Sequence, residues 1–539
     1  MFSKYFSGGE FMKKIVLVLV ILMMTSALTF AGGGQDASPT AVAENLPVTG
    51  RLNVEVFDRG TDGGKTLAHD NEWTRWIKQK VKADLNIDVT FIPVGRWSEN
   101  TDIVNLMAAG PGSAPDLCYT YGGGMVEAFR DQGGVMNLTP YIDSYLPDLK
   151  RLLGSDPAYP GKDFIRRNAD PQTGAIYSIP SYRVAIAQRN IFIRKDWLDK
   201  LGLPVPTNFN QFYQALRAFK DRDPGGVGAN RVVPFGQNSD VRWGLANLIH
   251  HFINPRMSDR DRWVYNIADR YIYMDGYKRG VQEMNKWYNE GLIFRDFPLM
   301  VTADDFYNQI KSGVVGAFCQ NWDMPYRTDY RLLVDLRRNV PGADYVPIDV
   351  VQNKDMMDKV GLQIFIPSFS PNKDAALKYL NWLAKPENYQ FLQIGREGVN
   401  HQMVNGVPMT IATPAGNPWI QNSPNNIDYT MPINGVEMGS ASLNARVLGL
   451  SYGDIPPEVI ATAFEVSTRN ARAAAVYQAT TTVNQYNRDL QEKADDLLAQ
   501  AITARPADFN RIWDNGIRDW LRSGGQEVFN ERSALYPRR

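Results

Sequence analysis

The feature that most constrains the fold of this 539-residue chain is a regular alternation of short apolar segments with amphipathic helical segments. Between residues 50 and 120 the predicted order is strand 52–57, helix 72–85, strand 87–92, helix 101–109 and strand 116–119. Strands that alternate with helices in this way are typical of α/β domains with a mostly parallel sheet. We therefore expect an α/β architecture, and the chain is long enough for two or three domains.

The N-terminal region has the pattern of a secretory signal. Two lysines precede an unbroken apolar run at 15–24, and small residues follow it. Such a run is too short to span a bilayer but suits the core of a signal peptide. We expect cleavage after Ala31, so that 1–31 is a signal peptide and 32–50 a flexible leader. Met12 is a hypothetical alternative start, because it directly precedes the two lysines.

The segment 190–226 predicts a strand and a helix, a break at Gly202 with prolines, and then a second helix. In that second helix Phe212, Leu216 and Phe219 recur at helical spacing, and Thr207 is the predicted N-cap. The run RKDWLDKLG followed by P-x-T resembles the solute-binding proteins of bacterial ABC importers. Other segments that resemble this family are 113–117, 175–180, 284–297, 360–385 and 507–534.

The resemblance implies a periplasmic-binding-protein-like fold, with two α/β lobes joined by a hinge of about three crossing segments and a ligand cleft between them. We expect the first lobe to comprise 51–178 and 359–450. The second lobe is then 179–358 with 451–539, including the C-terminal helices.

The same resemblance implies a substrate-binding component of an ABC importer. Such a protein captures a small solute by hinge closure and delivers it to separate permease subunits. The chain has 12 tryptophans, 25 tyrosines and 24 phenylalanines, and this aromatic content favours an oligosaccharide as the solute. An oligopeptide and an exported carbohydrate-active hydrolase or lyase are the alternatives. We expect a monomer without enzymatic activity, and the zero net charge gives no reason to expect nucleic acid as a partner.

The candidate ligand-binding residues follow predicted strand ends, because ligands of open parallel sheets bind beyond the carboxyl ends of the strands. Aromatic faces match sugar rings, and amide or charged groups bind hydroxyls. By the resemblance, Trp322 occupies the place where sugar-binding members stack a Trp. For every aromatic candidate, plain packing is the alternative. The candidates near strand ends are Asp58, Arg59, Trp97, Tyr119, Tyr121, Gln237, Asn238, Trp243, Asn321 and Trp322. Tyr182 and Arg183 are candidates at the expected crossing between the lobes, and His401 is a candidate because its segment, 395–401, resembles the family's G-x-E-G stretch.

No metal or cofactor is expected. The chain has four histidines, and their spacing is not that of a zinc site. Relatives often carry an EF-hand-like calcium loop after the second-lobe helix, and here that loop would begin at Asp223. Its alternating ligand positions have lost their side-chain oxygens at Gly225 and Val227, and Arg231 and Val232 replace the acidic pair. A calcium ion needs six to eight oxygen ligands, so we predict that calcium does not bind.

The positions of the cysteines bear on the compartment and on disulfide bonding. A lipoprotein box would place the lipid-bearing cysteine at position 33, where this chain has Gly33. We therefore expect a periplasmic protein without a lipid anchor. The two cysteines, Cys118 and Cys319, each end a predicted buried strand, and we interpret them as core residues rather than as a disulfide.

Overall fold

The computed structural model describes residues 44–58, 66–95, 98–156, 161–170, 173–267, 270–300, 302–327, 330–411, 416–419, 427–452, 455–473 and 480–536. The expected signal peptide, most of the leader and the candidate residues Arg59 and Trp97 lie outside the described residues. Within the described ranges, every helix is too short or too polar to cross a membrane.

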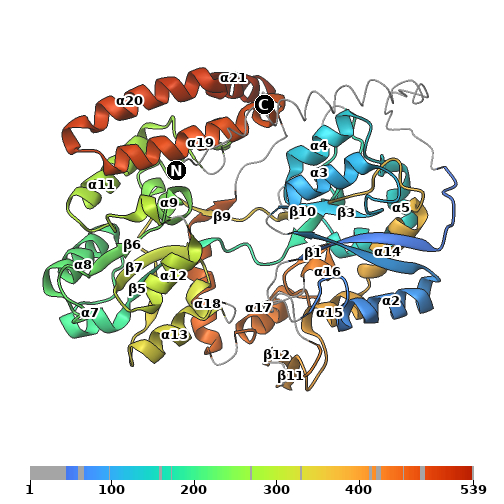
Figure 1. Ribbon diagram of the computed structural model, residues 1–539, viewed down its shortest axis with the longest axis horizontal. Helices are drawn as coiled ribbons and strands as arrows, with labels where there is room; N and C mark the ends of the chain where they lie inside the picture. Colours follow the sequence, from blue (N-terminus) through green and yellow to red (C-terminus); the bar gives the residue numbers. More distant parts are fainter. Residues whose placement is uncertain are drawn as a thin grey trace, which may run out of the picture.

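Two α/β lobes lie side by side (Figure 1), and the first contains the N-terminal strands. In it β1 and β2 are parallel, and a bridge from Val54 to Leu117 connects β1 to β3. A second set of strands has the order β13-β4-β10-β3. The strands are β1 (Arg51–Asp58), β2 (Asp88–Gly95), β3 (Cys118–Thr120), β4 (Ile179–Arg183), β10 (Val360–Phe365) and β13 (Ile433–Asn434). The helices are α2 (Glu72–Leu85), α3 (Glu99–Ala109), α4 (Gly123–Asp131), α5 (Ile142–Tyr145), α6 (Pro147–Leu153), α14 (Lys373–Leu383), α15 (Pro386–Ile394) and α16 (Ile427–Thr430).

The second lobe contains a sheet of order β6-β7-β5-β8, in which β6 and β7 are parallel and β5 is antiparallel to β7. Its strands are β5 (Arg189–Arg194), β6 (Val233–Gly236), β7 (Val315–Asn321) and β8 (Tyr345–Ile348). Its helices are α7 (Lys195–Leu201), α8 (Phe209–Arg222), α9 (Val241–His250), α10 (Asp259–Val264), α11 (Asp275–Asn289), α12 (Ala303–Lys311), α13 (Leu332–Asn339) and α18 (Pro457–Thr468). The C-terminal helices α19 (Thr481–Thr503), α20 (Phe509–Trp520) and α21 (Gln526–Leu535) cover this lobe at the top of Figure 1.

Two chain segments cross between the lobes next to each other. Residues 184–188 lead from β4 to β5, and residues 357–359 lead from β9 (Lys354–Met356) to β10. The two crossings are joined by a hydrogen bond from Met357 N–H to the Ile186 carbonyl, at 2.9 Å. Because β4 pairs with β10, it belongs to the first-lobe sheet. The expected boundary at residue 179 is therefore corrected to about residue 184.

The remaining elements lie beside these crossings or below them in Figure 1. Strand β14 (Ala471–Ala473) pairs with β9, which ties the C-terminal part of the chain to the second crossing. The hairpin of β11 (His401–Val404) and β12 (Val407–Thr410) and the helix α17 (Ala441–Gly449) lie at the bottom centre.

Each lobe has its own buried core, as the apolar spacing predicts. Phe212, Leu216 and Phe219 are fully buried on the inner face of α8. The N-cap of α8 is Asn208, whose side chain accepts a hydrogen bond from Gln211 N–H, so the predicted cap at Thr207 is wrong by one residue. Cys118 and Cys319 are both free and buried, in different lobes.

Candidate functional site

The second lobe gathers several predicted residues at one edge of its sheet. Since β6 and β7 are parallel, both end at this edge, and the antiparallel β5 begins there with Arg189. Gln237 and Asn238 follow the end of β6, Asn321 is the last residue of β7, and Trp322 follows it. Helix α9 starts at the same edge, directly after the loop that leaves β6, and it carries Trp243 in its first turn.

Trp243 is the best-placed aromatic residue of this edge, because its ring is only partly buried and is held in a fixed orientation. Its Nε1 donates a 2.5 Å hydrogen bond to Gln320 Oε1, and its backbone N–H bonds the carboxylate of the helix cap Asp240. The guanidinium of Arg189 lies over the ring, 4.6 Å from its centroid. Such a cation–π contact orients an indole without burying it completely.

Two other candidates of this lobe are engaged inside the protein. Gln237 is buried, and its amide donates to the carbonyls of Asn238 and Asp240, which shapes the turn before α9. Trp322 is only 6 % exposed and packs edge-on against Phe464 and Tyr452, with ring centroids 5.4 and 6.1 Å away. Both side chains are buried beneath the surface of this edge, whereas Asn238, Trp243 and Asn321 retain accessible surface.

The first lobe has a corresponding edge. β1 ends at Asp58, and β3 runs parallel to it and is followed by Tyr121. β4 ends there with Tyr182 and Arg183, next to the start of β10. Tyr119 does not reach this edge, because it is fully buried and its hydroxyl accepts a 2.8 Å hydrogen bond from Phe57 N–H.

The first-lobe edge carries partly buried aromatic rings and a constrained cation. Tyr121 stacks on Phe57 at 6.1 Å, and Lys359 Nζ lies 4.9 Å above the ring of Tyr182. Arg183 Nη1 donates to the carbonyls of Asp358 and Val360, at 2.6 and 2.9 Å. Burial lowers the pKa of Arg183 from its ordinary value. These contacts attach Arg183 to the second crossing, so this candidate residue is also part of the hinge.

The structure thus brings together most of the described candidates in two groups, one at each lobe edge, with the crossings 184–188 and 357–359 between them. His401 belongs to neither group. It lies in the β11–β12 hairpin at the lower margin of Figure 1, it is 7 % exposed, and its Nδ1 is 3.1 Å from the Ile394 carbonyl.

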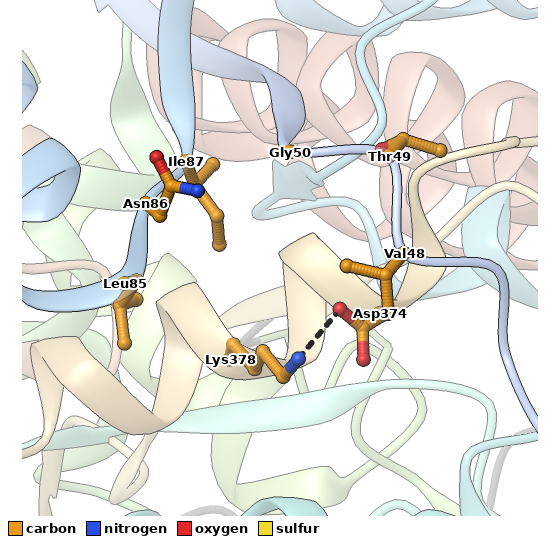
Figure 2. Close-up of a pocket in the computed structure, with 8 residues that line it drawn as sticks. All are labelled: Val48, Thr49, Gly50, Leu85, Asn86, Ile87, Asp374 and Lys378. Atoms are coloured by element: carbon orange, nitrogen blue, oxygen red, sulfur yellow. Dashed lines mark ion pairs between the residues drawn. The ribbon is translucent and has the colours of Figure 1, made fainter.

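A pocket of about 260 Å³ lies at the opposite end of the first-lobe sheet (Figure 2). It is lined by the amino ends of β1 and β2, at Gly50 and Ile87, and by an ion pair in which Lys378 is 2.9 Å from Asp374. The pocket lies at the start of the eight-residue strand β1 and Asp58 at its end, and the length of the strand from Arg51 to Asp58 corresponds to about 23 Å. A second pocket, of about 380 Å³, lies between α19 and α20. Neither pocket adjoins the strand-end edges.

The loop after α8 is closed by its own carboxylate. Asp223 has a left-handed backbone with φ 41°, and its two oxygens accept the N–H groups of Val227 and Gly228, at 3.0 and 2.8 Å. Across the described ranges, no group of three or more His, Cys, Asp or Glu side chains has the arrangement of a metal site.

Sequence reasoning missed three residues that hold Trp243, namely Arg189, Gln320 and Asp355. Arg189 Nη2 is 3.3 Å from Asp355 Oδ2, and the side-chain exposures are 0 % and 8 %. Burial alone would raise the pKa of Asp355, but the nearby His250 and the two arginines Arg189 and Arg262 outweigh burial and lower that pKa. Arg189 directly precedes the segment 190–226 in which the strand is predicted, so no local pattern indicates that its charge is buried.

Comparison with known proteins gives matches over much of the chain. Lipoprotein LipO of Bacillus subtilis (strain 168) is 28% identical over 237 residues, which are 42% of this chain and 43% of that protein. The fructooligosaccharide ABC transporter substrate-binding protein FusA of Streptococcus pneumoniae serotype 4 is 28% identical over 205 residues, 34% of this chain and 36% of that protein. The matched stretches therefore span less than half the length of these two relatives.

The fold is similar to that of solved structures over nearly the whole chain. The crystal structure of alginate-binding protein AlgQ2 without calcium ion superposes with a TM-score of 0.63 and 20% sequence identity, and covers 93% of this chain and 100% of that chain. The family model described as bacterial extracellular solute-binding protein matches residues 68–390, which is more than half of the chain. The chain therefore belongs to the bacterial extracellular solute-binding proteins.

Proposed function

We propose that this protein captures an oligosaccharide between its two lobes and delivers it to the permease of an ABC importer. The observation that carries the proposal is the position of three partly buried aromatic rings. Tyr121 and Tyr182 lie at the first-lobe edge and Trp243 at the second-lobe edge, on either side of the crossings. Amide and charged groups accompany the rings at each edge, in particular Asn238, Asn321 and Asp58.

This combination suits a sugar ligand. Aromatic faces cover the apolar faces of sugar rings, and a small number of oriented polar groups bind the hydroxyls. Two similar proteins also favour a sugar ligand, because FusA is named as a fructooligosaccharide-binding protein and AlgQ2 as an alginate-binding protein. We propose that the protein binds the sugar without converting it chemically. An oligopeptide remains the alternative ligand, because flat rings and amides also suit extended peptides.

The proposed mechanism is hinge closure about the crossings 184–188 and 357–359. A ligand that contacts Trp243 on one lobe and Tyr121 or Tyr182 on the other stabilises the closed form, which the permease then recognises. We propose a monomer as the working form. As a member of an extracellular family the protein is exported. Gly33, in place of a lipid-bearing cysteine, supports release into a periplasm rather than lipid anchoring.

A thermal-shift screen followed by calorimetry tests the ligand class. The panel contains neutral trisaccharides such as kestose, acidic trisaccharides such as those of alginate, and tripeptides. We expect an oligosaccharide to raise the melting temperature, since a ligand that binds only the folded state stabilises it by mass action. Stabilisation by the peptides, with none by the sugars, would contradict the proposal.

Trp243→Ala then tests the site. Loss of a central aromatic contact costs about 2 kcal/mol of binding free energy, which corresponds to about 30-fold weaker binding. Trp322→Phe is the matched control, because Trp322 packs internally, and its replacement by another ring is expected to change the dissociation constant less than 2-fold (~0.4 kcal/mol). Equal affinities for the wild type and Trp243→Ala would show that the ligand binds elsewhere.

A further inference from the structure

Trp243 is held on two sides by polar groups of the second lobe. The Arg189 guanidinium lies 4.6 Å from the ring centroid, and Gln320 Oε1 accepts the indole N–H at 2.5 Å. Arg189 Nη1 also reaches the carbonyl of Arg242, the neighbour of Trp243 in α9, at 3.5 Å. The orientation of the ring therefore depends on the position of Arg189.

Arg189 is in turn held by Asp355. The two side chains are buried and 3.3 Å apart, and the same Asp355 oxygen is 2.8 Å from His250 Nδ1. A buried guanidinium without a carboxylate partner is strongly unfavourable, so the Asp355 carboxylate determines where Arg189 lies. His250 is a residue of α9, the helix that carries Trp243, which attaches that helix to the same carboxylate.

Both members of the ion pair adjoin the crossings between the lobes. Arg189 is the first residue of β5 and directly follows the crossing 184–188. Asp355 lies in β9, two residues before the crossing 357–359 begins. Rotation of the lobes about these crossings therefore acts directly on the backbone that carries the pair.

We propose that Asp355 and Arg189 are positioning residues that orient Trp243 for ligand stacking and couple its orientation to hinge closure. The proposal rests on the proposed function, because it takes Trp243 as a ligand contact. Neither residue touches the ligand. Asp355 fixes Arg189, Arg189 fixes the ring, and the part of the ring that stays accessible contacts the bound sugar; the Arg242 guanidinium also lies near the ring, 6.0 Å from its centroid.

The chain offers a matched control on the same strand. At the far end of β5, Arg194 lies 4.7 Å from the ring centroid of Trp197 and bonds Asp196 at 2.8 Å. This second arrangement of Asp, Arg and Trp is located away from the crossings. Asp196→Asn therefore perturbs an equivalent ion pair without touching the proposed relay.

The first test needs no ligand. The near-ultraviolet circular dichroism of the wild type minus that of Trp243→Phe gives the contribution of the oriented Trp243 indole. We expect Asp355→Asn to remove at least half of that contribution and Asp196→Asn to leave it intact. Arg189→Lys is the second variant, in case Asp355→Asn does not fold. It keeps a cation for Asp355 but loses the planar group that stacks on the ring, so it is expected to give the same spectral loss. If Asp355→Asn and Arg189→Lys both fold and keep the full Trp243 contribution, the proposal is overturned.

The second test is a double-mutant cycle in binding, with kestose and an alginate trisaccharide as probes. We expect Asp355→Asn to weaken binding about 10-fold in the wild-type background and less than 2-fold in the Trp243→Phe background. Equal weakening in both backgrounds would overturn the positioning role. If neither trisaccharide binds the wild type, the proposed sugar site fails, whereas the spectral test still decides whether Asp355 orients Trp243.

Discussion

Replacement of Asp223 tests whether a carboxylate, rather than calcium, closes the loop after α8. In the structure this carboxylate accepts two backbone N–H groups, from Val227 and Gly228, at 3.0 and 2.8 Å. Its backbone is left-handed, with φ 41°, a conformation that Asp tolerates better than Ala does. Asp223→Ala therefore removes two hydrogen bonds and adds backbone strain at one position.

The expected loss can be worked from these contacts. Two hydrogen bonds to a carboxylate at a partly exposed site contribute about 2 kcal/mol, and Ala in a left-handed conformation costs about 1 kcal/mol. A total of about 3 kcal/mol lowers the melting temperature of a lobe-sized domain by about 6–12 °C. Differential scanning calorimetry measures the shift. Asp221→Ala, at an exposed position on α8, is the control and is expected to change the melting temperature by about 1 °C or less.

Calcium provides the decisive comparison. A site with a dissociation constant near 10 µM would stabilise the protein by about 2.7 kcal/mol in 1 mM calcium, a shift of several degrees. We expect the wild-type melting temperature to be the same in 1 mM calcium chloride and in EDTA. We also expect calcium not to rescue Asp223→Ala. A calcium-dependent rise of several degrees in the wild type would refute the reasoning, because it would require a bound ion at a loop closed by its own carboxylate.

Three further predictions concern the core and the hinge. Gly280→Ala is expected to destabilise the protein by about 2 kcal/mol in chemical denaturation, because its Cβ would lie 2.3 Å from the Ile249 carbonyl oxygen where α11 crosses α9. Cys118 and Cys319 are expected not to react with Ellman's reagent at pH 8 until the protein is unfolded, because burial raises the pKa of both thiols, that of Cys319 to about 12. The charged neighbours of Asp355 lower its pKa below 3.8, so its stabilising effect is present above about pH 4 and is lost as the pH falls through the lower folded-state value. Melting curves from pH 7 to pH 3 are therefore expected to fall less steeply for Asp355→Asn than for the wild type.

The fold could be predicted from the sequence to a large extent, because its signals are local. Helix α2 spans Glu72–Leu85, the bounds that its apolar spacing predicts, and the strands before and after it lie within three residues of their expected positions. The family resemblance rests instead on runs of matching residues such as RKDWLDKLG. The boundary between the lobes was less accurate, because the strand at Ile179–Arg183 finds its partner in β10, far along the chain. A strand pattern gives the strand but not the sheet to which it belongs.

The candidate site could be predicted only as an edge of each sheet. A residue at the end of a strand, or in the segment just after it, is placed at the correct edge by topology, and this is why Tyr121, Trp243 and Asn321 share their edges with the other candidates. Topology does not tell which of these side chains remains accessible. Trp322 follows β7 as expected, but Phe464 and Tyr452, more than 100 residues later, cover its ring. Burial of this kind depends on long-range packing that a local pattern does not contain.

The residues that orient Trp243 could not be predicted from a local sequence pattern either. Arg189 and Asp355 are 166 positions apart, and neither belongs to a motif. Arg189 directly precedes the predicted strand, where an arginine is compatible with a solvated strand end, and only the fold shows that it is buried. Once both residues are known to be buried, their pairing follows from charge, because each offsets part of the cost of burying the other. The two crossings then explain why the pair occurs here. They bring segments from distant parts of the chain together beside α9, where the proposed hinge closure would act on the proposed ligand contact.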